Sequence, residues 1–447
     1  MSDEKQYQNA LDYLYSFIDY SLTHQAHLSL KDSDLSRMYA LMQSLGNPQN
    51  DYPSIHVAGS KGKGSVSAFC ATALQTEGYR VGLYTSPHLR DFEERIQINR
   101  EPISRRDLVE FVDEIKPYVS AIPRLNTFEI TTAIAFWYFS RKRVDISVIE
   151  VGLGGRLDAT NVITPKVSVI TALFLEHTNI LGKTITKIAR EKAGIIKPGV
   201  PIVASPLKVE ARKTVETIAA QRKAYLIKMG SDYTFKKSKS SLDHQTFELK
   251  SLKSGEVASL DIRLLGQHQM ENAATAYVAL QQVRKQGVPI SEKAIYDGFA
   301  STEWPARFEI LRQDPPVVVD SAHNPDSARK LRQTIEEYFP DRSIVIIFGV
   351  SEDKNIVGMV NELLPGTTQL ICTQSTHPRA MEANALMNLV KPFGIPVIAF
   401  DNVRNALEYA LKLGGDNAVV LVTGSIFVAA TARIAWFENM KIKDFSY

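Results

Sequence analysis

The stretch that most constrains the fold of this chain covers residues 54–65 and reads SIHVAGSKGKGS. Ile55, Val57 and Ala58 are typical of the end of a buried strand. After the stretch, apolar or small residues recur at the spacing of one helix face, at Val66, Phe69, Cys70, Ala73 and Leu74. The stretch therefore predicts a strand, a glycine-rich turn and a helix.

A glycine-rich turn between a strand and a helix suits phosphate binding. Glycines let the backbone approach an anion, and the helix N-terminus offers free N–H groups and the positive end of its dipole. Lys63 can add a charge on the terminal phosphates, and the Ser65 hydroxyl can ligate magnesium. The strict pattern G-x-x-x-x-G-K-[ST] fails twice, because Val57 replaces its first glycine and Gly64 directly follows the lysine. A basic flexible loop is the alternative, but the flanking strand and helix favour a phosphate site.

Bulk composition excludes several classes of protein. The 447 residues predict two or three domains. The net charge of +3, from 52 basic and 49 acidic residues, argues against nucleic-acid binding. Cys70 and Cys372 lie in apolar surroundings, which fits a reducing compartment. We find neither a signal core nor a run of about 20 apolar residues, so we expect a cytoplasmic protein with no membrane partner.

A second informative stretch, residues 145–161, places a carboxylate at the end of an apolar strand. Glu150 is followed by the glycine-rich residues 152–155. In phosphate-loop proteins an acid at this place commonly holds magnesium. Polar or charged side chains then fill four of six positions: Arg156, Asp158, Thr160 and Asn161. This density favours a functional site over a solvated loop.

Two more strand ends carry polar groups. Ser86 follows a strand predicted at 79–85, and the Glu176-His177 pair follows one predicted at 167–171. Ligands bind at the carboxyl ends of strands in open α/β sheets. The first is therefore a candidate binding loop, with an ordinary Ser-Pro turn as the alternative. The second is a candidate metal site, with a solvent-facing pair as the alternative.

Lys192 is the most unusual residue of a helix predicted from about 184 to 195. It falls on the same face as Ile185, Ile188 and Ala189. Lysine is almost never fully buried without a partner. Either the side chain reaches past the apolar face to solvent, or its pKa is lowered or its charge is changed by modification.

The first part of the chain begins with helices predicted at 5–20 and 33–45, which we interpret as packing elements. His24 and His27 lie between them without a supporting carboxylate, so we assign no metal there. Short alternating segments at about 230–265 predict a β-hairpin region, with the nearby lysines at a solvated tip.

A second α/β unit with a mostly parallel sheet is predicted after residue 304, which divides the chain into domains 1–303 and 304–447. Its strands are expected at 308–312, 317–320, 344–348, 369–373, 397–400 and 418–423. Asp320 and His323 lie at the carboxyl end of the second of these strands, and Ser425 holds a similar place after the last.

Together these motifs resemble the folylpolyglutamate synthase and dihydrofolate synthase family of the Mur ligase superfamily. The matching segments are 59–65 (GSKGKGS), 85–88 (TSPH), 128–129 (FE), 150–161 (EVGLGGRLDATN), 191–194 (EKAG), 266–269 (GQHQ) with Asn272, 304–309 (WPARFE), 320–325 (DSAHNP) and, more weakly, 423–425 (TGS). The resemblance implies an α/β fold with a phosphate-loop ATP-binding domain, which has a mostly parallel sheet, and a smaller Rossmann-like C-terminal glutamate-ligase domain.

The resemblance also implies an ATP-dependent amide ligase. It would add L-glutamate to a folate-type carboxylic acid, either tetrahydrofolate for polyglutamylation, or dihydropteroate to give dihydrofolate, or both. ATP and two Mg²⁺ ions are the implied cofactors. The implied partners are these small molecules. We expect a monomer, because the sequence shows no extended apolar stretch beyond those assigned to the core.

Site residues follow from the matched positions. ATP binding is implied for Gly59, Ser60, Lys61, Gly62, Lys63, Gly64, Ser65, Asn272, Arg307 and Asp320. Magnesium binding is implied for Ser65, Glu150 and His177, and substrate binding for Ser86, Phe128, Asp158, His323 and Ser425. Catalytic roles are implied for Lys63, Lys192, Asp320 and His323, with Lys192 matching a lysine that relatives carry as a carbamate.

The sequence departs from the family at two places. Glu176-His177 stands where relatives usually have Asp-His, which bears on the metal ligands. Ser321 stands where they usually have glycine, which adds a side chain to a crowded loop and could narrow the choice of glutamate or acceptor.

The expected chemistry passes through an acyl phosphate, which the glutamate amine attacks. Either His323 or Asp320 is the candidate base for that amine, and His323 could instead bind the glutamate carboxylate. Other interpretations remain open: a Mur-type ligase acting on a cell-wall precursor, a nucleotide-binding regulatory module, or a kinase. The Gly-Lys-Gly-Ser form of the loop and residues 127–129 favour the folate branch.

Overall fold

The computed structural model describes residues 3–17 and 34–444, which divide into two compact units. Unit 1 contains Met1–Ser238, Thr246–Ile262 and Gln269–Thr302; unit 2 contains Lys239–Gln245, Arg263–His268 and Glu303–Tyr447. His24 and His27 lie outside the described residues. Within the described ranges, no helix has the length and apolar character needed to cross a bilayer.

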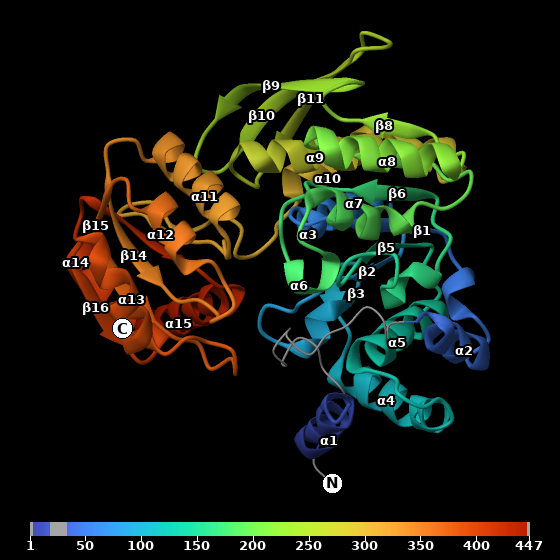
Figure 1. Ribbon diagram of the computed structural model, residues 1–447, viewed down its shortest axis with the longest axis horizontal. Coiled ribbons are helices and arrows are strands. Elements are labelled where there is room, and N and C mark those ends of the chain that lie inside the picture. The colour runs from blue at the N-terminus through green and yellow to red at the C-terminus, as the bar shows by residue number, and fades with distance from the viewer. Residues whose placement is uncertain (1–2, 18–33, 445–447) are drawn as a thin grey trace. The chain divides into compact units, whose positions relative to one another are not determined.

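Unit 1 is built on an eight-stranded sheet of order β4-β3-β2-β5-β1-β6-β7-β8 (Figure 1). The strands are β1 (Ser54–Ala58), β2 (Val81–Tyr84), β3 (Ile96–Ile98), β4 (Glu101–Pro102), β5 (Ile146–Glu150), β6 (Val167–Ile170), β7 (Ile202–Ala204) and β8 (Leu226–Lys228). All pair in parallel except β3 and β4. Because the central strands β1, β5 and β6 are buried throughout, their apolar runs fit a covered parallel sheet.

The helices of unit 1 lie before, between and after these strands along the chain. They are α1 (Asp3–Tyr15), α2 (Ser36–Ser44), α3 (Lys63–Thr76), α4 (Arg105–Ser120), α5 (Thr127–Arg141), α6 (Thr178–Leu181), α7 (Ile185–Lys192), α8 (Val209–Gln221), α9 (Gln267–Lys285, which begins in unit 2) and α10 (Glu292–Ser301). The described part of unit 1 also contains the 3-10 turns η3 (Pro48–Asn50), η4 (Phe92–Arg95), η5 (Ala159–Val162) and η6 (Ala193–Ile195). A capping box between Asn126 and Glu129 fixes the start of α5. The helices α1, α4 and α5 pack together (Figure 1). Their buried side chains form much of one hydrophobic core cluster of unit 1.

A three-stranded sheet of order β11-β10-β9 follows the large sheet. Its strands are β9 (Tyr233–Ser240), β10 (Gln245–Ser251) and β11 (Val257–Ile262). Lys236, Lys237 and Lys239 lie within β9 rather than at a hairpin tip, so the expectation of a lysine-bearing tip was wrong. The alternating exposure along β9 explains why a strand can carry several lysines.

Unit 2 is a six-stranded sheet of order β12-β13-β17-β14-β15-β16. The strands are β12 (Glu309–Arg312), β13 (Val317–Val319), β14 (Ser343–Phe348), β15 (Thr367–Thr373), β16 (Val397–Phe400) and β17 (Ala418–Thr423). Its helices are α11 (Pro325–Tyr338), α12 (Ile356–Leu363), α13 (Ala383–Val390), α14 (Val403–Gly414) and α15 (Ile426–Asp444), with a 3-10 turn η7 (Lys391–Phe393). Only β12 pairs antiparallel. Both units thus have the predicted α/β fold with a mostly parallel sheet.

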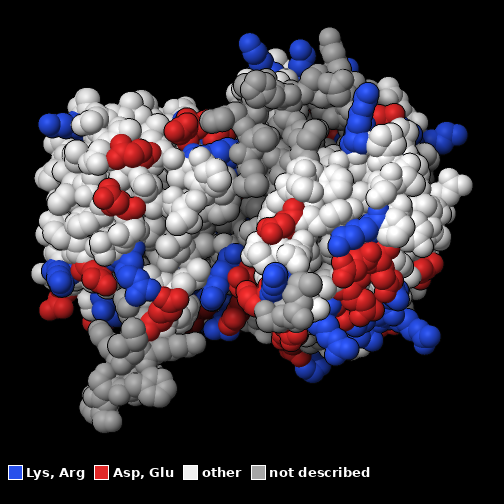
Figure 2. All heavy atoms as spheres, turned by 90° about the horizontal axis from the view of Figure 1, so that it is seen from below, with Lys and Arg blue, Asp and Glu red and all other residues white. Residues whose placement is uncertain are grey.

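Charged side chains of both signs are intermixed on the face shown in Figure 2. This distribution agrees with the near balance of 52 basic and 49 acidic residues in the chain. Cys70 and Cys372 are both buried and carry free thiols.

Candidate active site

The glycine-rich turn joins β1 to α3, as the sequence predicts. Gly62 caps the helix in the left-handed region with φ 91°, and a Cβ there would lie 2.3 Å from Asn272 Oδ1. At Gly59 an added Cβ would lie 1.8 Å from Thr171 Oγ1. Both glycines are therefore required by close packing, and Asn272 lies directly against the turn.

Ser60 and Lys61 fasten the turn to the segment after β6. Their backbone N–H groups both donate to Ala172 O, at 2.9 and 3.2 Å. The Ser60 hydroxyl donates to Phe174 O at 3.2 Å and accepts from Phe174 N at 3.1 Å. These two amides are engaged within the protein. The N–H groups of the first turn of α3, which the helix itself cannot pair, are the better anion donors.

Lys63 and Glu150 meet at the centre of this site. Lys63 Nζ lies 3.7 Å from Glu150 Oε1, and both side chains are largely buried. Glu150 is the last residue of β5 and pairs with Val57 of β1, which brings it next to the turn. Ser65, buried in the first turn of α3, adds a hydroxyl. A carboxylate and a hydroxyl beside a phosphate-binding turn are hard oxygen donors that fit Mg²⁺.

Lys192 is buried at the end of α7 with 2% of its surface exposed. Its Nζ lies 2.8 Å from Glu176 Oε1 and donates to Gly59 O at 2.8 Å. The alternative of a lysine reaching to solvent is therefore wrong, and so is that of a solvent-facing Glu176, whose side chain is 14% exposed. The side chain of Lys192 instead donates a hydrogen bond to the backbone of the glycine-rich turn 59–65, called the phosphate turn below.

Electrostatics of this pair follow from burial and from the neighbouring lysines. Burial lowers the pKa of Lys192, and Glu176 opposes that shift without reversing it. Burial alone would raise the pKa of Glu176, but Lys192, followed by Lys63 and Lys61, lowers it to about 2. Glu176 is thus an anion at neutral pH. In this structure its carboxylate forms an ion pair with Lys192.

His177 occupies the N-cap of α6 in a left-handed conformation with φ 45°. It directly follows Glu176, so it lies on the same strand-to-helix connection as the partner of Lys192. Within residues 3–17 and 34–444, no three His, Cys, Asp or Glu side chains form a group that could hold a metal.

Asp158 and Phe128 both contact the glycine loop 152–155 that follows Glu150. Asp158 Oδ2 accepts the N–H of Leu153 at 2.8 Å. A Cβ on Gly152 would lie 2.4 Å from the Phe128 ring, and that ring lies 6.0 Å from the Tyr84 ring, centroid to centroid. Ser86 follows Tyr84 by two residues, at the carboxyl end of β2. Ser86 and Asp158 thus follow the neighbouring strands β2 and β5, and Phe128 reaches the glycine loop from the first turn of α5.

In unit 2, Asp320 is buried at the end of β13 and organises the loop that follows. Its two carboxylate oxygens accept the N–H groups of Phe308 at 2.8 Å and Ala322 at 2.7 Å. Ser425 follows the neighbouring strand β17, and its hydroxyl accepts the N–H of Phe427 at 3.2 Å. The Gly424 N–H donates to Ala322 O at 3.0 Å, which joins the two loops.

His323 and Arg307 complete this part of unit 2. His323 Nδ1 lies 2.9 Å from Ser321 O, and because a carbonyl can only accept, Nδ1 carries the proton. Arg307 donates from a guanidinium nitrogen to the Ser321 hydroxyl. The family departure at Ser321 therefore supplies a hydroxyl that holds Arg307.

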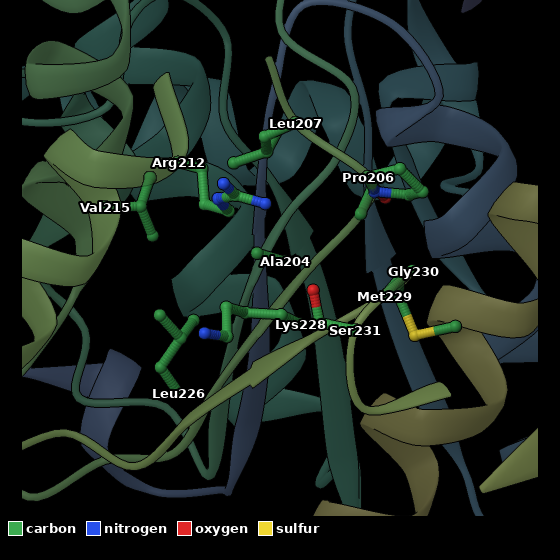
Figure 3. A pocket seen from close by; sticks show the side chains of 11 residues that line it. Ala204, Pro206, Leu207, Arg212, Val215, Leu226, Lys228, Met229, Gly230 and Ser231 are labelled. Atoms are coloured by element: carbon green, nitrogen blue, oxygen red, sulfur yellow. The ribbon is translucent and has the colours of Figure 1, made fainter. Parts of the chain in front are cut away.

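A pocket of about 220 Å³ lies elsewhere in unit 1, at the carboxyl ends of β7 and β8 (Figure 3). Arg212 and Lys228 line it together with Leu207, Leu226 and Met229. Lys228 Nζ also pairs with Glu216 Oε1 at 3.0 Å. None of the residues predicted for the active site lines this pocket.

Comparisons with known proteins identify the family. Residues 57–280 match the Mur ligase middle domain, and residues 306–426 match the Mur ligase glutamate ligase domain. A dihydrofolate synthase/folylpolyglutamate synthase of Bacillus subtilis is 35% identical over 408 residues, which cover 89% of this chain and 94% of that protein. The chain belongs to the folylpolyglutamate and dihydrofolate synthase family of Mur ligases.

Solved structures agree with this family assignment. Mycobacterium tuberculosis folylpolyglutamate synthase complexed with ADP is 32% identical, with a TM-score of 0.88 and coverage of 97% of this chain and 99% of that chain. E. coli FolC in complex with DHPP and ADP is 30% identical, with a TM-score of 0.84 and coverage of 98% and 97%. The resemblance, the fold class and the enzyme class predicted from the sequence are confirmed: this folylpolyglutamate synthase family member is an ATP-dependent ligase.

Three further buried residues contact the predicted site residues of this family member. Thr171 packs against Gly59, Thr160 donates to Asp158, and His56 on β1 is bonded to Thr160. The sequence analysis assigned no role to His56 or Thr171 and placed Thr160 only among several crowded polar residues. His56 is a histidine inside an otherwise apolar strand, and that contrast was the available signal. The partnership of Glu176 with Lys192 had no such signal, because 15 intervening residues separate them in the sequence.

Proposed function

We propose that this enzyme adds L-glutamate to a folate-type carboxylic acid, using dihydropteroate as well as reduced folates as acceptors. The observation that carries the proposal is the meeting of Lys63, Glu150 and Lys192 around the phosphate turn in a chain whose residues 306–426 match a glutamate ligase domain. Two relatives support this choice of acceptors: the Bacillus subtilis protein is a dihydrofolate synthase/folylpolyglutamate synthase, and E. coli FolC has been solved in complex with DHPP and ADP.

ATP would be held at the turn between β1 and α3. Lys63 and the N–H groups of the first turn of α3 bind its terminal phosphates, and Gly59 to Ser65 form the surrounding loop. Asn272 lies against Gly62, where it can contact the nucleotide. Arg307 and Asp320 in unit 2 are the further nucleotide residues of this proposal.

Ser65, Glu150 and His177 are the residues that would hold Mg²⁺, which in such sites neutralises charge shared by the β- and γ-phosphates. Glu150 is held beside Lys63, so its carboxylate is directed at the turn. We propose two ions, and metal titration should give a stoichiometry of two per chain in the presence of nucleotide.

The first chemical step forms an acyl phosphate. An oxygen of the acceptor carboxylate attacks the γ-phosphorus of ATP, the bond from that phosphorus to the bridging oxygen breaks, and ADP leaves with the electron pair. Lys63 stabilises the charge on the transferred group. Ser86, Phe128 and Asp158 are the proposed residues that bind the acceptor.

In the second step, the glutamate amine attacks the acyl carbon and inorganic phosphate leaves. The amine must lose a proton, and we favour His323 over Asp320 as its base. Both Asp320 oxygens already accept backbone N–H groups, whereas proton placement on His323 Nδ1 makes Nε2 the basic nitrogen. Ser425 is the proposed contact for glutamate.

Carbamylation of Lys192 is part of the proposal. It requires the neutral amine, and burial favours that form by lowering the pKa of Lys192. As an unmodified ammonium, Lys192 pairs with Glu176. Loss of activity on removal of bicarbonate, and its return on resupply, would support the modification; the matched loss of one CO₂ in intact mass would locate it on the protein.

An isotope experiment tests the acyl phosphate directly. An acceptor carrying ¹⁸O in its carboxylate should transfer one ¹⁸O atom to inorganic phosphate for each amide formed. Phosphate without label would contradict this mechanism. We also propose a cytoplasmic monomer, for which the two buried free thiols support a reducing compartment and sedimentation velocity would test the assembly state.

A further inference from the structure

A chain of three buried side chains connects the centre of the large sheet to the glycine loop. His56 is fully buried on β1, between β5 and β6. Its Nε2 lies 2.9 Å from Thr160 Oγ1, and the Thr160 hydroxyl donates to Asp158 Oδ1 at 2.5 Å. None of these three side chains exposes more than 5% of its surface.

The direction of these hydrogen bonds can be worked out from the donors available. Asp158 also accepts the N–H groups of Thr160 at 3.1 Å and Leu153 at 2.8 Å, a set of donors that suits a carboxylate. The Thr160 proton therefore points to Asp158, so Thr160 Oγ1 must accept from His56. This requires the His56 tautomer with its proton on Nε2 and none on Nδ1.

Two independent observations agree with that tautomer. His56 Nδ1 is buried without a hydrogen-bond partner. Burial costs less free energy for an unprotonated ring nitrogen than for an unpaired N–H donor, so this observation favours a proton on Nε2. Burial, and to a lesser extent the charge of Lys197, lowers the pKa of His56 to about 3. The ring is therefore neutral at physiological pH, and a neutral ring has one proton to place.

The far end of the chain reaches the residues proposed for the acceptor. One Asp158 oxygen accepts from Thr160 and the other from Leu153, so the carboxylate spans the loop. The adjoining Gly152 packs against the Phe128 ring. Burial raises the pKa of Asp158, and the donors from Thr160, Leu153 and Gly152 oppose that shift. Loss of the Thr160 hydroxyl would remove the shorter of the two hydrogen bonds to Asp158 Oδ1 and leave that oxygen with the Thr160 backbone N–H as its remaining donor from this residue.

We propose that His56, acting through Thr160, is a positioning residue that orients Asp158 and thereby sets the acceptor site of the enzyme. The part that concerns the acceptor rests on the proposed function. If His56 only fills the core, its replacement should lower the stability of the protein and affect the KM values for the acceptor and for ATP equally. If His56 positions Asp158, its replacement should raise the KM for the acceptor and leave the KM for ATP nearly unchanged.

A matched pair of substitutions at Thr160 separates these roles. Thr160→Val keeps the shape and removes the hydroxyl, while Thr160→Ser keeps the hydroxyl and removes a methyl group. We expect Thr160→Val to raise the KM for the acceptor by about tenfold or more, as for loss of a hydrogen bond to a charged group. The KM for ATP should change less than about twofold, and Thr160→Ser should retain an acceptor KM close to that of the wild type.

A second pair tests His56 itself. The amide of His56→Gln can donate to Thr160 as Nε2 does, whereas His56→Leu cannot. His56→Leu should reproduce the Thr160→Val phenotype and His56→Gln should restore much of the acceptor KM. Equal acceptor and ATP effects in both variants, or an unchanged acceptor KM in Thr160→Val and His56→Leu, would overturn the proposal.

Hydrogen exchange gives a readout that needs no substrate. The Leu153 amide, which donates to Asp158, should exchange faster by about tenfold in Thr160→Val than in Thr160→Ser, at equal global stability. If the wild type turns over neither acceptor, the proposed function is wrong. The exchange rate of the Leu153 amide still tests whether Thr160 orients Asp158. Equal exchange at Leu153 in the two variants would overturn it.

Discussion

Lys192 Nζ lies 2.8 Å from Glu176 Oε1 in an ion pair that is buried beneath the phosphate turn. The same ammonium donates to Gly59 O, so a charged pair formed by α7 and the segment after β6 supports the backbone that would hold ATP. Buried pairs of this kind are costly to break because the remaining charge has no partner.

In protein freed of bicarbonate, in which Lys192 is an unmodified ammonium, Glu176→Gln should therefore lower the free energy of unfolding by about 3 kcal/mol, because it leaves that ammonium buried without a counter-ion. Urea unfolding measures the effect. The double variant Glu176→Gln with Lys192→Met removes both charges and should be more stable than the sum of the two single losses predicts. Additive losses would show that the two groups do not interact.

Lys63→Ala should reduce turnover by at least about a hundredfold and leave the fold intact, since the side chain acts on charge that develops during phosphoryl transfer. Initial rates of ADP release measure the turnover, and the midpoint of thermal unfolding measures whether the fold is intact. Lys213→Ala, which removes an exposed lysine of α8, is the matched control and should be neutral in both. Near-normal rates in Lys63→Ala would remove Lys63 from the mechanism.

Gly62 and Gly78 offer a matched comparison, because both have φ in the left-handed region, at 91° and 106°. An added Cβ meets Asn272 at Gly62 and nothing within 4 Å at Gly78. Gly78→Ala should cost only the backbone strain of about 1 kcal/mol. Gly62→Ala should additionally raise the KM for ATP, as steady-state kinetics would measure. Similar ATP kinetics in the two variants would contradict the close packing of the turn.

Acid sensitivity should depend on His56. Its pKa is 6.5 for the free group and about 3 in the folded protein, so between these values the unfolded chain binds a proton that the folded chain does not. Stability is therefore present above pH 6.5 and is lost as the pH falls toward 3. His56→Gln should lose stability less steeply over this window, by up to about 1.4 kcal/mol per pH unit. Parallel profiles from urea titrations would contradict a neutral buried ring.

Much of this architecture could be predicted because it is encoded locally. Short segments rich in apolar and β-branched residues predicted β1, β5, β6 and most strands of unit 2. The segments β3, β4, β7 and β8 contain two or three residues each, too few for periodicity to distinguish them from loops. Their pairing depends on neighbouring strands rather than on their own sequence.

The candidate site divides in the same way. The phosphate turn and the acid at the end of β5 could be predicted, since each is a short motif with its own chemistry. The burial of Lys192 could be predicted from helical spacing, but its Glu176 partner could not, because that contact joins two segments by tertiary packing. The hydrogen-bonded side chains from His56 to Asp158 could not be predicted either. More than 100 positions separate the two residues in the sequence, and the pairing of β1 with β5 brings them close together.

ADP release from Mg-ATP and L-glutamate, with dihydropteroate or monoglutamyl tetrahydrofolate as acceptor, is the most direct test of folate glutamylation by this enzyme. We expect release with each acceptor, dependent on glutamate and matched by one amide per ADP. Release with one acceptor alone would restrict the enzyme to a single activity. Release with neither, or release that needs no glutamate, would contradict a folate-type glutamate ligase.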